Sequence, residues 1–170
     1  MVPRICIIAG SKTDLPLILA VLEKLPANTV EIVVHVISCH RNPEVLREFC
    51  EKTVSLCGFT AIIGVGSKAL ALPGIIDAWL RYYKVDVPVI GVALGKKDTA
   101  DFNAACLSIA CLPNTPVLMD ENHNCYCGPE GLERAIFRVI DGQMPEYIQR
   151  ESKPHEWNVW SNYLPKAMSA

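Results

Sequence analysis

The stretch IVVHVISCHRNP, residues 32–43, contains a strand-like run, a polar turn and the start of a helix. The run is rich in β-branched residues, which favour strands, and Pro43 suits the first turn of a helix. Ser38, His40 and Arg41 stand between these two segments. Ligands of open parallel α/β sheets bind beyond the carboxyl ends of buried strands, so we expect a functional site at these three side chains.

The same order of strand, turn and helix recurs along the rest of the chain. Strands are expected at residues 5–9, 30–37, 60–65, 87–93 and 116–119, and helices at residues 15–25, 43–57, 75–83, 100–111 and 131–140. Residues 5–9 form a short, continuously apolar run, as in a strand that is covered on both faces. Strands that alternate with helices predict a parallel sheet with right-handed crossovers and helices on both faces.

Two further polar loops follow expected strands, GSKTD at residues 10–14 and GSKALALPG at residues 66–74. The first loop offers a hydroxyl at Ser11, a carboxylate at Asp14 and the N–H groups of a helix start. Helix N-termini attract phosphate, and a carboxylate accepts hydrogen bonds from ribose hydroxyls. The alternative is that Thr13 or Asp14 only caps the helix.

Length and composition indicate one domain at residues 1–141 and a C-terminal arm at residues 142–170. The arm differs in composition, and its aromatic residues Trp157, Trp160 and Tyr163 suggest packing on a neighbouring subunit or on its own subunit. Hydrophobic residues make up 51% of the chain, more than one small core buries, which favours a homo-oligomer.

Charge and hydrophobic patterning argue against several classes of partner. The net charge of −2 and the scattered basic residues predict no binding to nucleic acid. No apolar run reaches the roughly 18–20 residues that span a membrane, and the beginning MVPRICIIAG has no signal-peptide pattern. We therefore expect no membrane association and a cytoplasmic protein.

The eight cysteines are expected to be reduced, because six of them lie in or beside apolar segments where thiols act as small hydrophobes. Cys125 and Cys127 with His123 lack the fuller ligand set of zinc motifs, so no metal site is expected. Cys39 precedes His40, but the sequence offers no acidic partner for a Cys–His nucleophile.

Several segments together carry a resemblance to a known family. They are GSKTDLP (residues 10–16), SCHRNP (38–43), LPG (72–74), PVIGV (88–92) and, within residues 107–113, LSI and LP. In this order they resemble the 5-aminoimidazole ribonucleotide carboxylase family of purine biosynthesis, which includes the N-carboxyaminoimidazole ribonucleotide mutases. The resemblance extends from about residue 5 to residue 140.

The resemblance implies a three-layer α/β/α flavodoxin-like domain with a five-stranded parallel sheet. It implies a homo-octamer with active sites at subunit junctions, a ribonucleotide substrate, carbon dioxide as a reaction partner, and neither a metal nor an organic cofactor. The product would be 4-carboxy-5-aminoimidazole ribonucleotide.

The resemblance also implies roles for individual residues. Ser11 and Asp14 would hold phosphate and ribose, Arg41 would pair with phosphate, Ser38 would orient the substrate and His40 would move the proton. The remaining residues of the implied substrate site are Gly10, Gly66, Ser67, Lys68 and Leu70. Lys68 is either a phosphate contact or a solvated loop charge.

The implied chemistry suits these residue types. An aminoimidazole carbon is electron-rich enough to attack carbon dioxide, and the proton on that carbon must then leave. An imidazole, with an ordinary pKa of about 6.5, can carry that proton near neutral pH. The apolar residues 69–72 could enclose the carbon dioxide.

The carbon donor stays open between free carbon dioxide and the N-carboxy substrate. Ala71 stands where the mutase branch usually has histidine, and Arg41 stands where the branch that uses free carbon dioxide normally has lysine. The alternative to an enzyme is a non-catalytic nucleotide-binding or regulatory relative, because one fold can serve several functions.

Overall fold

The computed structural model describes residues 2–114 and 116–144. The strands are β1 (Arg4–Ala9), β2 (Glu31–Val36), β3 (Ala61–Gly66), β4 (Val89–Ala93) and β5 (Tyr126–Cys127). The helices are α1 (Leu15–Leu22), α2 (Pro43–Glu48), α3 (Val54–Cys57), α4 (Leu72–Tyr82), α5 (Ala100–Ala110) and α6 (Gly128–Ile140). A 3-10 turn, Lys12–Asp14, precedes α1, and a π-helical turn, Phe49–Thr53, joins α2 to α3.

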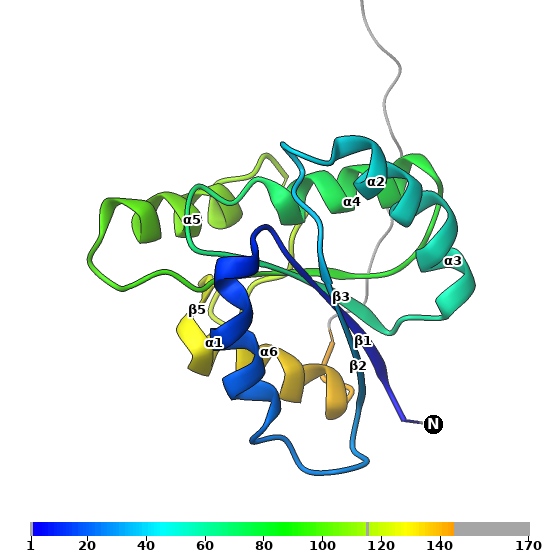
Figure 1. Cartoon of the computed structure of the whole chain (residues 1–170), viewed down its shortest axis with the longest axis horizontal. Coiled ribbons are helices and arrows are strands. Elements are labelled where there is room, and N and C mark those ends of the chain that lie inside the picture. Colours follow the sequence, from blue (N-terminus) through cyan, green and yellow to red (C-terminus); the bar gives the residue numbers. More distant parts are fainter. Residues whose placement is uncertain (1, 115, 145–170) are drawn as a thin grey trace, which may run out of the picture.

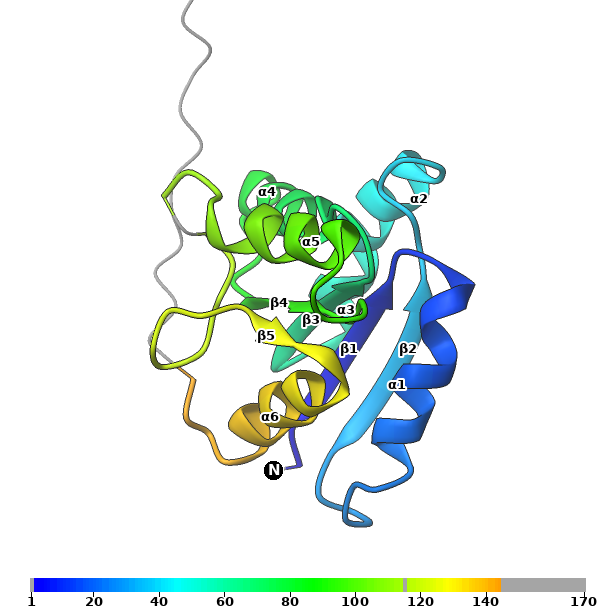
Figure 2. The same ribbon diagram turned by 90° about the vertical axis from the view of Figure 1, so that its left-hand side faces the viewer.

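The five strands form one parallel sheet in the order β2-β1-β3-β4-β5. Helices α1 and α6 cover one face, and α2, α3, α4 and α5 cover the other (Figures 1 and 2). This arrangement confirms the predicted three-layer, flavodoxin-like α/β/α domain. Of the predicted C-terminal arm, residues 145–170 lie outside the described residues. No helix of the described residues is both long and apolar enough to cross a membrane.

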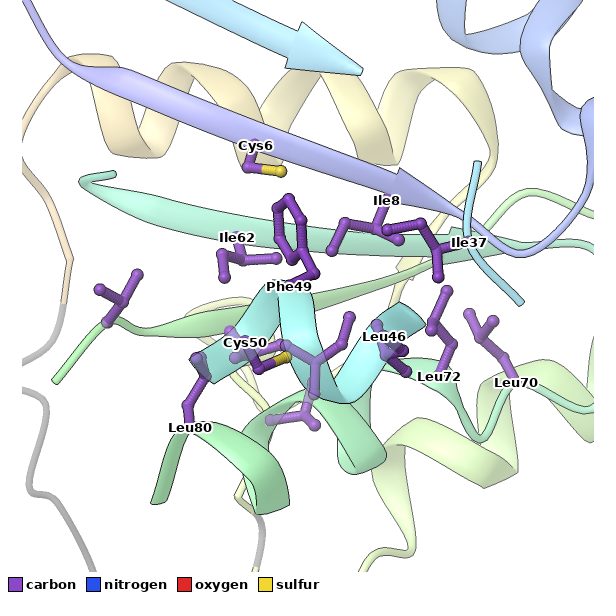
Figure 3. Close-up of a cluster of buried hydrophobic side chains, with 14 of the residues drawn as sticks. Cys6, Ile8, Ile37, Leu46, Phe49, Cys50, Ile62, Leu70, Leu72 and Leu80 are labelled. Carbon is purple, nitrogen blue, oxygen red and sulfur yellow. The ribbon is translucent and has the colours of Figure 1, made fainter. Parts of the chain in front are cut away.

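The sheet has a hydrophobic core on each face because successive strand side chains point to opposite sides. On β1, Ile5 and Ile7 face α1 and α6, whereas Cys6 and Ile8 face the other helical layer. Figure 3 shows the cluster on the face covered by α2, α3, α4 and α5, in which the Phe49 side chain points toward the strands.

The sequence placed the fifth strand wrongly. Residues 116–119 were expected to form it, but Leu118 makes only an isolated parallel bridge to Ile90. The fifth strand is Tyr126–Cys127, which pairs with Val92 and Ala93 at the end of β4.

A turn around Asp120 explains this difference. Its carboxylate accepts hydrogen bonds from the backbone N–H groups of Asn122 and Asn124, at 3.0 and 2.8 Å. The backbone N–H of Asp120 also donates to the carbonyl of Asn124, at 2.9 Å. These local bonds reverse the chain after a brief contact with β4, and Pro116 lacks an N–H for a sheet ladder.

The second strand was expected to be buried, but it is not fully buried in the single chain. β2 is the edge strand, and its residues are half-buried or exposed. The apolar side chains of β2 are therefore partly exposed in the single subunit.

Some helix ends differ from the prediction by about one turn. Helix α1 ends at Leu22 instead of residue 25, α4 begins at Leu72 instead of residue 75, and α6 begins at Gly128 instead of residue 131. A proline in the first turn begins both α4 and α6, since proline needs no hydrogen-bond partner for an N–H there.

Helix α5 lies very close to β4, and a glycine allows this approach. A Cβ added to Gly91 would lie 2.9 Å from side-chain carbons of Ile109. Ile109 is buried, whereas Leu107 on the same helix is 60% exposed.

We expect Ile109→Ala to lower the free energy of unfolding by about 2–5 kcal/mol, because it opens a cavity beside β4. Leu107→Ala is the matched control and should change it by no more than about 0.5 kcal/mol. Urea denaturation at one protein concentration measures both values. Equal losses for the two variants would contradict this packing of α5.

Candidate active site

The loops after β1, β2 and β3 surround one cavity of about 470 Å³. The cavity is lined by Gly10, Ser11, Thr13, Asp14, Ser38, Cys39, His40, Arg41, Gly66, Ser67, Lys68, Ala69, Leu70, Ala71 and Leu72. All ten residues that the sequence analysis placed in the site are in this set. The three loops are far apart in the sequence, and the parallel sheet brings them to one edge.

Ser11 organises the first loop. Its side chain accepts hydrogen bonds from the backbone N–H and the hydroxyl of Thr13, at 3.3 and 2.9 Å. Ser11 caps the 3-10 turn. Asp14 occupies the N-cap position of α1, as the alternative expected, but its side chain makes no cap hydrogen bond there.

Asp14 instead joins the first loop to the third. Its side chain is buried, and one carboxylate oxygen accepts a hydrogen bond from the Ser67 hydroxyl. A buried carboxylate is costly without such a donor, so this bond holds the two loops together.

Ser38 holds the second loop in shape through hydrogen bonds to the loop backbone. It is buried, and its hydroxyl oxygen accepts hydrogen bonds from the backbone N–H groups of His40 and Arg41, at 3.3 and 3.2 Å. Its carbonyl accepts a further bond from the N–H of Asn42, at 2.9 Å. These bonds fix the turn so that the exposed His40 lines the cavity.

Arg41 links the second loop to the first. Its guanidinium donates a hydrogen bond of 2.7 Å to the carbonyl of Gly10. The side chain is exposed at the cavity, so the planar fork stands beside the Ser11 turn. Two hydrogen-bonded contacts, Arg41 to Gly10 and Ser67 to Asp14, therefore connect all three loops.

Lys68 pairs with a residue outside the three loops of the cavity. Its ammonium group lies 3.4 Å from the carboxylate of Asp101 on α5, and both side chains are mostly exposed. A surface pair of this kind contributes little to stability, so Lys68 can exchange this partner for a ligand at low cost.

The third loop supplies an apolar wall. A Cβ on Gly66 would lie 2.6 Å from Leu70, so glycine allows the loop to fold back onto the end of β3. Leu70 and Leu72 are buried in the hydrophobic cluster of Figure 3, and Ala69 and Ala71 line the cavity between them and solvent.

The thiols show no sign of activation. Burial raises the pKa of Cys39 above its ordinary value, although a backbone hydrogen bond and Arg41 partly oppose this. Burial likewise raises the pKa of Cys6 and of Cys50 to about 12. A raised pKa disfavours the thiolate, which is the nucleophilic form, so the surroundings of Cys39 do not favour a Cys–His nucleophilic pair. All eight cysteines are free thiols.

The sequence analysis missed one cluster of three thiols. Cys125 and Cys127 lie beside Cys106 of α5, whereas His123 is outside this group. No sequence signal could indicate Cys106, because it precedes Cys125 by many residues and meets it only through the fold.

The chain is similar to known proteins over most of its length. The family model described as AIR carboxylase matches residues 4–122. The N5-carboxyaminoimidazole ribonucleotide mutase of Pyrococcus abyssi is 32% identical over 157 residues, which cover 91% of this chain and 83% of that protein. The phosphoribosylaminoimidazole carboxylase of Candida glabrata is 33% identical over 97 residues, which cover 57% of this chain and 17% of that protein.

Among solved structures, PurE of Treponema denticola has a TM-score of 0.58 and 16% sequence identity, covering 82% of this chain and 80% of its own. At this identity the likeness supports the fold alone. The match to most of the chain and the relative from Pyrococcus abyssi establish the family independently, and the chain is a member of the AIR carboxylase family.

Proposed function

We propose that this protein is an enzyme of purine biosynthesis that forms 4-carboxy-5-aminoimidazole ribonucleotide. The observation that carries the proposal is the gathering of His40, Ser38 and Arg41 with the Ser11 turn around one cavity, in a member of the AIR carboxylase family. The cavity volume of about 470 Å³ suits a small ligand such as a mononucleotide.

The substrate roles follow from charge and hydrogen-bonding capacity. The Arg41 guanidinium and the Ser11 turn form the phosphate end, because a planar fork and helix-start N–H groups both favour phosphate oxygens. Asp14 accepts a hydrogen bond from ribose, and Ser67 holds its carboxylate in position. Ser38, whose oxygen already accepts two N–H groups, can donate its hydroxyl hydrogen to the base. Gly10, Gly66, Lys68 and Leu70 complete the binding site.

His40 is the proposed proton carrier. In the migration reaction it donates a proton to the exocyclic nitrogen as the carbamate C–N bond breaks and carbon dioxide leaves. The ring carbon then attacks carbon dioxide and forms the new C–C bond. His40 accepts the proton from that carbon, which restores the aromatic ring and returns the imidazole to its starting state. In these steps the only chemistry that His40 supplies is proton transfer.

The apolar wall supports the carbon dioxide step. Released carbon dioxide must stay beside the ring until the carbon attacks it, and an apolar surface excludes the water that competes for this space. Ala69, Leu70, Ala71 and Leu72 provide that surface at the edge of the cavity.

We expect His40→Asn to lower kcat by about 10²–10⁴-fold, because it removes the group that carries the proton. Ultraviolet absorbance of the carboxylated nucleotide measures turnover in either direction. The control is His123→Asn, since His123 is exposed outside the cavity and its positive φ of 60° suits asparagine. Binding of the nucleotide to both variants is measured separately by calorimetry.

Unchanged turnover in His40→Asn would overturn the proposed role of His40. A protein that binds the nucleotide but turns over none of it, in wild type as well as in the variant, would instead be the non-catalytic nucleotide-binding relative.

The carbon donor is proposed to be the N-carboxy substrate, because the relative with the long match is an N5-carboxyaminoimidazole ribonucleotide mutase. Migration needs no added carbon dioxide. We therefore expect product from N-carboxyaminoimidazole ribonucleotide at a rate that added bicarbonate does not raise. A forward rate from 5-aminoimidazole ribonucleotide that rises in proportion to bicarbonate would assign the free carbon dioxide reaction instead.

A homo-octamer is part of the proposal. Leu56 on α3 is 86% exposed and Tyr82 on α4 is 63% exposed, and the edge strand β2 is only half-buried in the single chain. Such apolar exposure is typical of a surface that another subunit covers.

The eight free thiols support a reducing compartment, and we propose the cytoplasm.

Sedimentation equilibrium tests the assembly. The expected mass is eight times 18.7 kDa, about 150 kDa. We expect Leu56→Glu or Tyr82→Glu to lower the mass, because each would place a charge in an apolar contact. A wild-type mass of a single chain would contradict the proposed oligomer.

A further inference from the structure

Three thiols form a cluster away from the proposed active site. Cys106 belongs to α5, Cys125 directly precedes β5 and Cys127 ends it. Their Sγ atoms all lie within 4.8 Å of one another, and those of Cys106 and Cys127 are 3.5 Å apart. All three residues are half-buried.

The spacing of the three sulfurs suits a single metal ion. Zinc–thiolate bonds are about 2.3 Å long, so two thiolates on one tetrahedral ion lie about 3.8 Å apart. The Sγ atoms of Cys106 and Cys127 are 3.5 Å apart and no separation in the cluster exceeds 4.8 Å, so the three sulfurs lie close to this spacing. Small side-chain adjustments would place all three sulfurs around one ion.

The fold holds the three ligands on one rigid frame. Residues 125 and 127 are two apart along an extended segment, so both side chains point to the same face of the sheet. Both pack against the core on the α5 side, whereas Tyr126 between them packs on the opposite face. Cys127 pairs with Ala93 on β4, and Ile109 holds α5 close to Gly91 of that strand. The ligands therefore come from two elements that share β4 as their support.

We propose that Cys106, Cys125 and Cys127 form a binding site for one soft d¹⁰ metal ion, held through three thiolates. Thiolate ligands select ions such as Cu(I), Zn(II) and Cd(II) over Mg(II), Ca(II) and Mn(II). A single Cys106–Cys127 disulfide would use only two of the sulfurs and would leave the convergence of Cys125 unexplained. His123 is not a member of the site.

The metal site is separate from the nucleotide cavity. Cys127 pairs with Ala93, and Ala93 pairs with Gly66, so β4 lies between the cluster and the third loop of the cavity. A bound ion would tie the short strand β5 to α5. It would hold no part of the nucleotide, so the inference stands or falls independently of the proposed reaction.

Titration of the reduced, metal-free full-length protein with Cd²⁺ tests the proposal. The sulfur-to-cadmium charge-transfer band in the ultraviolet reports thiolate coordination, and Zn²⁺ competition against a chromophoric chelator gives the affinity. We expect one tightly bound equivalent in wild type. Serine at any one of the three positions should weaken binding about 100-fold or more, because even partners outside the coordination shell contribute about 10–100-fold.

Two variants serve as matched controls. Cys111→Ser changes an exposed thiol just after α5, and His40→Asn changes the proposed active site. Both should bind Cd²⁺ as wild type does. Where a serine variant loses its circular dichroism spectrum, Cys106→Ala replaces it, since alanine favours the helix on which Cys106 lies.

Three results would overturn the metal site. They are the absence of a tight equivalent in reduced wild type, equal affinity in wild type and the Cys106, Cys125 and Cys127 variants, or equal loss in Cys111→Ser. Mass spectrometry of protein purified without reductant shows whether Cys106 and Cys127 are joined. A disulfide there, in a protein that binds no Cd²⁺ after reduction, would assign the cluster to thiol oxidation instead.

Discussion

The site depends on one constraint: the parallel strands β1, β2 and β3 end next to one another at the same edge of the sheet. Ala9, the last residue of β1, lies opposite Val36 at the end of β2 and Val65 near the end of β3. The three following loops therefore begin side by side, although they are far apart in the sequence. Residues on different loops can then bond directly, as Arg41 does to Gly10 and Ser67 does to Asp14.

The side chains that line the cavity differ in how deeply they are buried. Asp14 and Ser38 are buried and hold the loops in shape through hydrogen bonds. His40 and Arg41 are exposed at the cavity, where a ligand can reach them. Because the buried groups keep the loops rigid, the exposed imidazole and guanidinium can be presented with little loss of conformational entropy on binding.

The opposite edge of the sheet is less well secured. β5 has only two residues, and its backbone pairing to β4 covers Val92 and Ala93 alone. The thiols of Cys106 and Cys127 meet beside this short strand. An ion held by the cluster would add a cross-link where hydrogen bonds between the strands are fewest. The loops around the cavity follow longer strands, which pair along more of their length.

The sequence by itself determined the strand–helix alternation, the parallel sheet and the loops of the site, because apolar runs and the polar turns after them are local features. Only the tertiary structure decided the rest. The Asp120 turn moved the fifth strand to Tyr126–Cys127, and the strand order left β2 at the edge. The same packing brought Cys106 to Cys125 and Cys127. The Asp120 turn is held by local hydrogen bonds, but the strand order and the thiol cluster depend on contacts between distant segments, which no local pattern of residues encodes.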